Sequence, residues 1–144
     1  MEIREVNSIE FNSLYDIDKS AFLDEWNAEI FNEELSIETR KYFGIYDNDI
    51  MMGYIGLNII LDECDIIRIA IHKEYQGLGL SKILFEYAKN YLVSNGVSKI
   101  MLEVSDKNTV AINLYERLGF NKIYVRENYY SDNTSALIYE MYLN

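Results

Sequence analysis

Two glycines stand between an apolar run and an amphipathic segment, an order of residues that can bind an anion. The run Ile66–Ile71 is rich in β-branched residues and predicts a buried strand. After Gly77 and Gly79, apolar residues recur at the spacing of a helix over 79–95. The first N–H groups of such a helix lack internal partners, and glycine lets a ligand approach them closely. A phosphate site is therefore one interpretation, and a tight strand-to-helix turn explains the spacing equally well.

Two further side chains have the chemistry to move protons. Glu103 stands at the C-terminal end of a predicted strand, where open α/β sheets bind ligands, and its carboxylate can accept a proton from an amine. Tyr115 lies on the apolar face of a later predicted helix, and its phenol can give a proton to a leaving group. Spacing alone favours simpler roles for both, a solvated strand-end carboxylate and a core tyrosine. Cys64 has no recognisable base and His72 lies in a loop, so we expect neither to catalyse.

The elements that must position these residues predict an α/β fold, with a mixed sheet of about seven strands flanked by about four helices. A strand, a helix and a strand around the two glycines imply two parallel strands with a right-handed crossover. Asn7 and Ser8 are expected to cap the first helix, and Asn27 the second. The expected elements are a strand near Ile3, helices over 11–22 and 27–35, strands at 41–46, 50–60 and 65–71, a helix at 79–95, a strand at 99–104, a helix at 108–118, and strands at 120–126 and 135–142.

Composition bounds the class of protein. The 144 residues are 49% apolar, which predicts one folded domain over 1–144. A formal charge of −11 argues against direct binding of nucleic acid and is compatible with a basic protein or an amine as substrate. No segment has the length of apolar sequence that crosses a membrane, and the charged start of the chain does not resemble a signal peptide, so we expect a cytoplasmic protein. The single cysteine excludes an internal disulfide.

Several motifs together resemble the GNAT superfamily of acetyl-CoA-dependent N-acetyltransferases. They are Gln76-x-x-Gly79-x-Ser81, Leu102-Glu103-Val104, and Asn108-x-x-Ala111-x-x-Leu114-Tyr115 with Gly119-Phe120. Further segments are similar to the RimI branch, the ribosomal-protein N-terminal alanine acetyltransferases. These are Asp62-Glu63, Ile69-Ala70-Ile71, Tyr75-Gln76 and Asn128-Tyr129-Tyr130, with a weaker likeness from Ala21-Phe22 through Trp26 to Phe31. The resemblance covers nearly the whole chain and implies a GNAT fold.

The resemblance implies a site for acetyl-CoA as cosubstrate, and no metal. The loop of Gly77, Leu78, Gly79, Leu80, Ser81 and Lys82 would hold the pyrophosphate with backbone N–H groups. The exposed edge of Ile69, Ala70 and Ile71 would pair with the pantetheine amides, where the fourth and fifth strands splay apart, and Asn108 would face the pantetheine arm. The last glycine or alanine of the family loop is Ser81 here; serine is small, and we expect binding to survive.

By the same resemblance, Glu103 serves as base through a water molecule and Tyr115 as acid, while the backbone N–H of Ile71 polarises the acetyl carbonyl. The acceptor would be the N-terminal amine of a protein, a ribosomal protein in the RimI branch. Trp26, Tyr129 and Tyr130 would wall its pocket. Glu25 replaces the proline that usually precedes this tryptophan, which leaves the preferred first residue of the substrate open.

Two alternatives remain. The first keeps fold and cofactor but acetylates a small amine such as a polyamine, an amino acid or an antibiotic. A closed pocket beside Tyr129, lined by carboxylates, would favour it. The second is a scaffold that keeps CoA without catalysis, against which the presence of both Glu103 and Tyr115 argues.

Overall fold

The computed structural model describes residues 1–22 and 25–143, whose strands form one seven-stranded sheet in the order β1-β2-β3-β4-β5-β7-β6. Every neighbouring pair is antiparallel except β4 and β5, which are parallel. The mixed α/β architecture is therefore confirmed. The strands are β1 (Glu2–Glu5), β2 (Arg40–Asp47), β3 (Ile50–Ile60), β4 (Glu63–Ile71), β5 (Lys99–Ser105), β6 (Asn121–Arg126) and β7 (Ala136–Tyr142).

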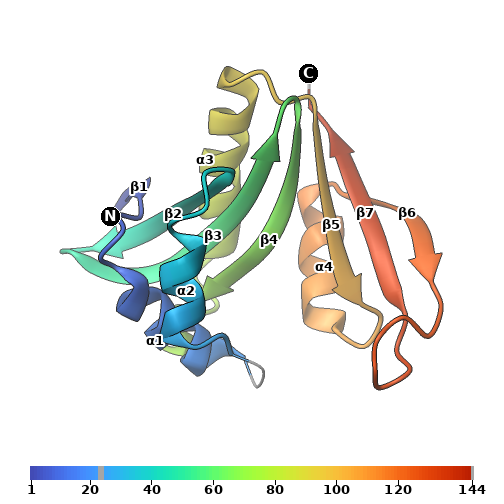
Figure 1. The fold of residues 1–144 in the computed structure, drawn as a ribbon, viewed down its shortest axis with the longest axis horizontal. Coiled ribbons are helices and arrows are strands. Elements are labelled where there is room, and N and C mark those ends of the chain that lie inside the picture. The colour runs from blue at the N-terminus through green and yellow to red at the C-terminus, as the bar shows by residue number, and fades with distance from the viewer. Residues whose placement is uncertain (23–24, 144) are drawn as a thin grey trace.

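The helices cover the two faces of this sheet in pairs (Figure 1). One apolar cluster joins α3 and α4 to strands β2 to β5 and β7, and a second joins α1 and α2 to the opposite face of β2 to β4. No helix in the described ranges is long and apolar enough to cross a membrane. The helices are α1 (Phe11–Ala21), α2 (Ala28–Glu34), the short 3-10 helix η1 (Lys73–Tyr75), α3 (Leu80–Ser94) and α4 (Thr109–Leu118).

The parallel strands β4 and β5 are paired at one end only. Residues 63–65 of β4 face residues 99–101 of β5, and beyond Asp65 the two strands diverge, as Figure 1 shows. A bulge leaves Ile67 without a partner on β3. Because side chains alternate along a strand, this extra residue turns Arg68 and Ala70 toward α1 while Ile69 and Ile71 stay on the α3 side. The sheet therefore opens at its centre, next to a re-aimed stretch of β4.

Local sequence signals explain most element boundaries. Asn48 and Asn128 adopt positive φ in the turns between β2 and β3 and between β6 and β7, a conformation that asparagine tolerates. Asn27 caps α2 as expected, since its side-chain oxygen accepts a hydrogen bond from the Ile30 N–H at 2.9 Å. Gly119, with φ of 105°, ends α4.

The expected cap of the first helix is wrong. The N-cap of α1 is Glu10, and Asn7 instead accepts a hydrogen bond from the Ile9 N–H inside the preceding turn. Glu10 accepts from the Asn7 N–H and from both terminal nitrogens of Arg4. Contacts with β1 therefore fix this turn more strongly than the capping preference of Asn7 and Ser8 does.

Candidate active site

The divergence of β4 and β5 opens a cleft with Glu103 on its wall. Glu103 lies on β5 with an exposed side chain, and the hydroxyl of Tyr130 donates a hydrogen bond to its Oε2 at 2.9 Å. The cleft has a volume of about 450 Å³ and an apolar wall with two carboxylates and one arginine. Its lining comprises Asp65, Ile66, Ile67, Met101, Leu102, Glu103, Arg126 and Ile138. A carboxylate that is exposed yet oriented by a tyrosine can accept a proton from a solute.

Tyr130 is held in place by the loop between β6 and β7. Its N–H donates to the carbonyl of Thr134 at 3.1 Å, and Asp132 accepts from both the N–H and the hydroxyl of Thr134. Burial and the neighbouring Glu103 raise the pKa of Tyr130 to about 12, so its hydroxyl stays a donor at neutral pH. The ring of Tyr129, 52% exposed, meets the Tyr130 ring edge-to-face with centroids 5.3 Å apart. Tyr130 therefore lies next to Glu103 and Tyr129 packs against it, although neither tyrosine lines the cleft itself.

Tyr115 lies on the other face of the sheet. Its ring is buried in the α3–α4 core and meets Phe120 edge-to-face at 5.9 Å. Burial raises its pKa to about 12, and the positive charge of Arg68 acts in the opposite direction. Within the described part of the chain, every buried side-chain nitrogen or oxygen has a hydrogen-bond partner. The Tyr115 hydroxyl has none among the described residues, so this oxygen is not completely shielded from solvent.

Glu103 and Tyr115 therefore lie on opposite faces of the sheet. Along β5, Leu102 and Val104 are buried against the helices α3 and α4, while Glu103 between them faces away. A carboxylate can remove a proton at one atom and a phenol can supply one at another.

The edge of β4 that faces this opening carries the backbone groups of Ile71. The N–H of the next residue, His72, donates to Met52 on β3, and successive N–H groups of a strand point to opposite edges. The Ile71 N–H must then face away from β3, toward the opening. Its carbonyl accepts a hydrogen bond from Gln76 Nε2 at 3.0 Å, which ties the strand to the glycine loop. Ile69 and Ala70, also expected at this edge, precede it on the same strand.

The glycine loop presents an uncapped helix N-terminus. Gly77 and Gly79 have φ of 82° and 77°, and a Cβ on either would meet nothing within 4 Å. Gly79 is the N-cap of α3 and supplies no side-chain cap. The first helical hydrogen bond runs from the Ile83 N–H to the Gly79 carbonyl, so the N–H groups of residues 80–82 precede it. The open space and the free donors fit a phosphate group.

Asn108 and Trp26, which are predicted to contact the cofactor and the acceptor, both make contacts within the protein that stabilise the fold. Asn108 caps α4, since its Oδ1 accepts from the Ala111 N–H at 3.1 Å. Trp26 donates its backbone N–H to Asp18 at 2.8 Å, and its ring lies 5.4 Å from that of Phe31. Contact of Asn108 with a cofactor stays a prediction.

Sequence reasoning missed a charged pair beside this site. Asp18 on α1 is fully buried and accepts hydrogen bonds from Arg68 Nε at 3.0 Å and Nη2 at 2.8 Å. A signal was present, because each is a charged residue at a position where the apolar pattern predicts burial. Opposite charges in two apolar runs indicate that the runs pack together.

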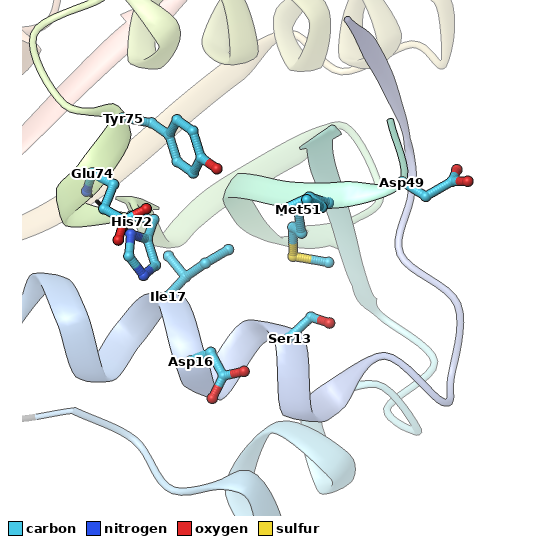
Figure 2. Close-up of a pocket in the computed structure, with 9 residues that line it drawn as sticks. Ser13, Asp16, Ile17, Asp49, Met51, His72, Glu74 and Tyr75 are labelled. Atoms are coloured by element: carbon cyan, nitrogen blue, oxygen red, sulfur yellow. Dashed lines mark hydrogen bonds between the residues drawn. The ribbon is translucent and has the colours of Figure 1, made fainter. Parts of the chain in front are cut away.

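A second pocket, of about 390 Å³, lies between α1, the start of β3 and η1 (Figure 2). His72 lines it, and its Nδ1 accepts from the Glu74 N–H at 3.1 Å, as the dashed line marks. His72 therefore caps η1, in agreement with a structural role in the loop. No group of ligating side chains in the described ranges could hold a metal ion. Burial raises the pKa of Cys64 to about 12, which keeps this thiol protonated and unreactive at neutral pH.

The amino-acid sequence was compared with known protein families. The chain matches the acetyltransferase (GNAT) family over residues 11–120, most of its length. The chain belongs to this family. GNAT acetyltransferases use acetyl-CoA, and the uncapped N-terminus of α3 with its two glycines fits the pyrophosphate of that cofactor. The protein is thus a GNAT N-acetyltransferase, and the predicted fold and enzyme class are confirmed.

Relatives place the chain near one branch of the GNAT family. It is 34% identical over 130 residues to the ribosomal protein bS18 alanine N-acetyltransferase of Escherichia coli K12, covering 87% of this chain and 86% of that protein. The crystal structure of the S18 alanine N-acetyltransferase from Escherichia coli superposes with a TM-score of 0.91 at 30% identity, covering 99% and 94% of the two chains. An aminoglycoside 6'-N-acetyltransferase complexed with coenzyme A gives a TM-score of 0.85 at 17% identity, covering 99% and 97%, which shows the fold alone. The predicted resemblance to the RimI branch is confirmed.

Proposed function

We propose that this enzyme transfers an acetyl group from acetyl-CoA to the N-terminal amine of a protein, with Glu103 as base and Tyr115 as acid. The observation that carries the proposal is the Glu103 carboxylate, oriented by Tyr130 at an open cleft where the sheet divides. The Escherichia coli relatives are named for acetylating the alanine of ribosomal protein bS18, which supports a ribosomal protein as substrate.

The base must remove a proton before the amine can attack. An α-amino group has a pKa near ~8 and a lysine near ~10.4, so deprotonation at pH 7 costs about 1.4 and about 4.6 kcal/mol respectively. An exposed carboxylate working through water suits the smaller cost. Glu103 then takes the proton of the acceptor amine and returns it to solvent.

The acid acts on the departing sulfur. Bound acetyl-CoA supplies the thioester, whose acetyl carbon forms the new C–N bond as the C–S bond breaks. The Tyr115 hydroxyl, whose ring is buried in the core, gives its proton to the sulfur and recovers one from solvent. The Ile71 N–H, directed toward the opening, donates to the carbonyl oxygen as charge develops there. Protons and bonds balance, and Cys64 takes no part.

The shape of the site favours a protein N-terminus over a small amine. Tyr129 is 52% exposed, so its side chain does not close over a pocket, whereas the small-amine alternative expects a closed one. An open mouth admits a chain that continues away from the reacting amine. The scaffold alternative has no support in a site that retains both proton-transfer groups.

Mass spectrometry of peptides incubated with the enzyme and acetyl-CoA tests the proposal. The peptides begin with Ala, Ser, Met or Gly, and one has a blocked N-terminus and an internal lysine. We expect acetylation of free N-termini only, and a loss of rate of a hundredfold or more, about the size of a general-base contribution, in Glu103→Gln.

A matched variant controls for charge. Glu140→Gln removes a carboxylate on the neighbouring strand β7, opposite Met101, and should leave the rate unchanged. Modification of the internal lysine alone would overturn the N-terminal assignment. CoA binding without acetylation of any peptide would favour the small-amine or scaffold alternatives, and a panel of amines separates those two.

A further inference from the structure

Three carboxylates near the first two helices are each held by one arginine and one tyrosine of the sheet. Each triad joins a helix to a strand through side-chain hydrogen bonds, and the carboxylate accepts from both partners. The triads are Glu10 with Arg4 and Tyr46, Glu34 with Arg40 and Tyr42, and Asp18 with Arg68 and Tyr54.

The Asp18 triad differs from the others in burial. The side chain of Asp18 is 0% exposed, against 16% for Glu10 and 13% for Glu34. Asp18 accepts four hydrogen bonds, two from Arg68, one from the Tyr54 hydroxyl and one from the Trp26 N–H. A carboxylate with so many donors holds its partners in one geometry. It therefore ties the start of the α2 segment to β3 and β4.

The guanidinium of Arg68 fills an aromatic cage. Its central carbon lies 4.3 Å from the ring centroid of Phe22 and 4.7 Å from that of Trp26. Aromatic faces around a carboxylate are a usual site for a cationic ligand. Here the chain's own arginine takes that position, with only 15% of its side chain exposed. A cationic substrate group cannot enter without displacing it.

We propose that Arg68, fixed by Asp18, is a specificity-determining residue that makes the acceptor site reject a basic first residue. The inference rests on the proposed function and on the expectation from the family resemblance that Trp26 walls the pocket of the acceptor's first residue. With the cage already filled by a guanidinium paired to Asp18, the wall offers that residue an apolar surface and no vacant site for a cation. An uncharged first side chain can pack on that surface, whereas a basic one would lose its hydration beside a cation whose carboxylate partner is already engaged.

The position of Arg68 on β4 supports this role. The bulge at Ile67 turns Arg68 toward α1, one residue before the edge of β4 expected to bind the cofactor. The positive charge of Arg68 also acts to lower the pKa of Tyr115, although the effect of burial is larger and raises it.

The test compares Arg68→Ala with Arg4→Ala on peptides that begin with Ala, Gln or Arg. Arg4 is the matched control, because it too donates two hydrogen bonds to one carboxylate, and its central carbon lies 3.9 Å from the ring centroid of Tyr46, in a triad away from the cleft. The Gln peptide separates size from charge. We expect Arg68→Ala to raise kcat/KM for the Arg peptide relative to the Gln peptide by about tenfold or more, and Arg4→Ala to leave the ratio unchanged.

A second variant covers the case in which Arg68→Ala fails to fold with Asp18 unpaired. Asp18→Asn combined with Arg68→Gln removes both charges and keeps polar side chains, and it should raise the same ratio. An unchanged ratio in a folded variant would overturn the proposal. A wild-type enzyme that prefers the Arg peptide to the Gln peptide would overturn it as well.

Fluorescence separates this inference from the proposed function. Trp26 is the sole tryptophan, so its emission reports on the cage without any substrate. Adding guanidinium ions to Arg68→Ala should refill the cage and restore the wild-type emission, while Arg4→Ala should not respond. If no peptide is acetylated but guanidinium restores the emission, the proposed function fails and the filled cage stands. If guanidinium changes nothing, the filled cage itself is wrong.

Discussion

The Tyr130 hydroxyl donates a hydrogen bond to Glu103 Oε2 at 2.9 Å, and so connects the loop between β6 and β7 to strand β5. One carboxylate oxygen is thereby engaged, and the other can receive a proton from water or an amine. The loop that carries a predicted pocket residue therefore also orients the predicted base. In the proposed function, entry of an acceptor and alignment of the base are therefore coupled through a single hydroxyl.

Tyr130→Phe removes this donor and keeps the ring. We expect kcat to fall by about tenfold, which is the effect of losing one hydrogen bond to a charged group. The KM for acetyl-CoA should change little. Steady-state kinetics measure both constants. Tyr139→Phe is the control, because Tyr139 donates an equivalent bond to Glu116 at 2.8 Å, on the α4 side of the sheet. Equal losses of kcat in the two variants would mean that Tyr130 acts only through stability.

Tyr115→Phe tests the predicted acid. The loss of the proton donor should lower kcat by about a hundredfold or more. Thermal stability should change little, since no hydrogen bond joins this hydroxyl to another described residue. The pKa of about 12 keeps the phenol protonated, so the wild-type kcat should not decline between about pH 8 and about pH 10. A fall of the wild-type rate in that range, absent from the variant, would contradict a raised pKa.

The central unit of the fold was predictable because its signals are local. The apolar run of β4, the glycines before α3 and the helical spacing after them each act within a few residues, and the parallel pairing follows from chain connectivity. The hairpin of β2 and β3 and the cap at Asn27 are local in the same sense.

The parts that sequence reasoning missed depend on distant contacts. Asp18 and Arg68 lie far apart in the chain, and only the bulge in β4 brings the arginine to the α1 face. The cap of α1 is Glu10 because Arg4 of β1 binds it, which no pattern near Asn7 reveals. The bond from Tyr130 to Glu103 likewise needs the β5–β7 register.

Gly79→Ala tests the anion site of α3. Alanine at φ of 77° costs about 1 kcal/mol of folding stability, without a clash, because nothing lies within 4 Å of the added Cβ. The strained turn should tilt the first N–H groups of α3 and weaken CoA binding by about tenfold in calorimetry. Gly96→Ala, at φ of 81° and the opposite end of α3, should cost similar stability and leave CoA affinity unchanged. Equal CoA affinity in both variants would move the pyrophosphate away from this loop.

The tyrosines predict a loss of stability in alkali. Burial raises the pKa of Tyr115, Tyr130 and Tyr139 to about 12, and raises that of Tyr54 further. An unfolded tyrosine ionises near ~10, so above that pH the unfolded chain binds fewer protons than the folded one. The free energy of unfolding should therefore be unaffected by these groups below about pH 9 and should fall as the pH rises from about 10 to about 12.

Urea unfolding at several pH values, with absorbance of the ionised phenol as a second signal, measures this fall. Tyr115→Phe is the informative variant, because it removes one titrating group without breaking a hydrogen bond between described residues. In this variant the free energy of unfolding should fall less steeply with pH, because about one proton fewer is released per molecule that unfolds. Phenol ionisation that precedes unfolding, at the pH of free tyrosine, would show that the folded protein does not protect these hydroxyls.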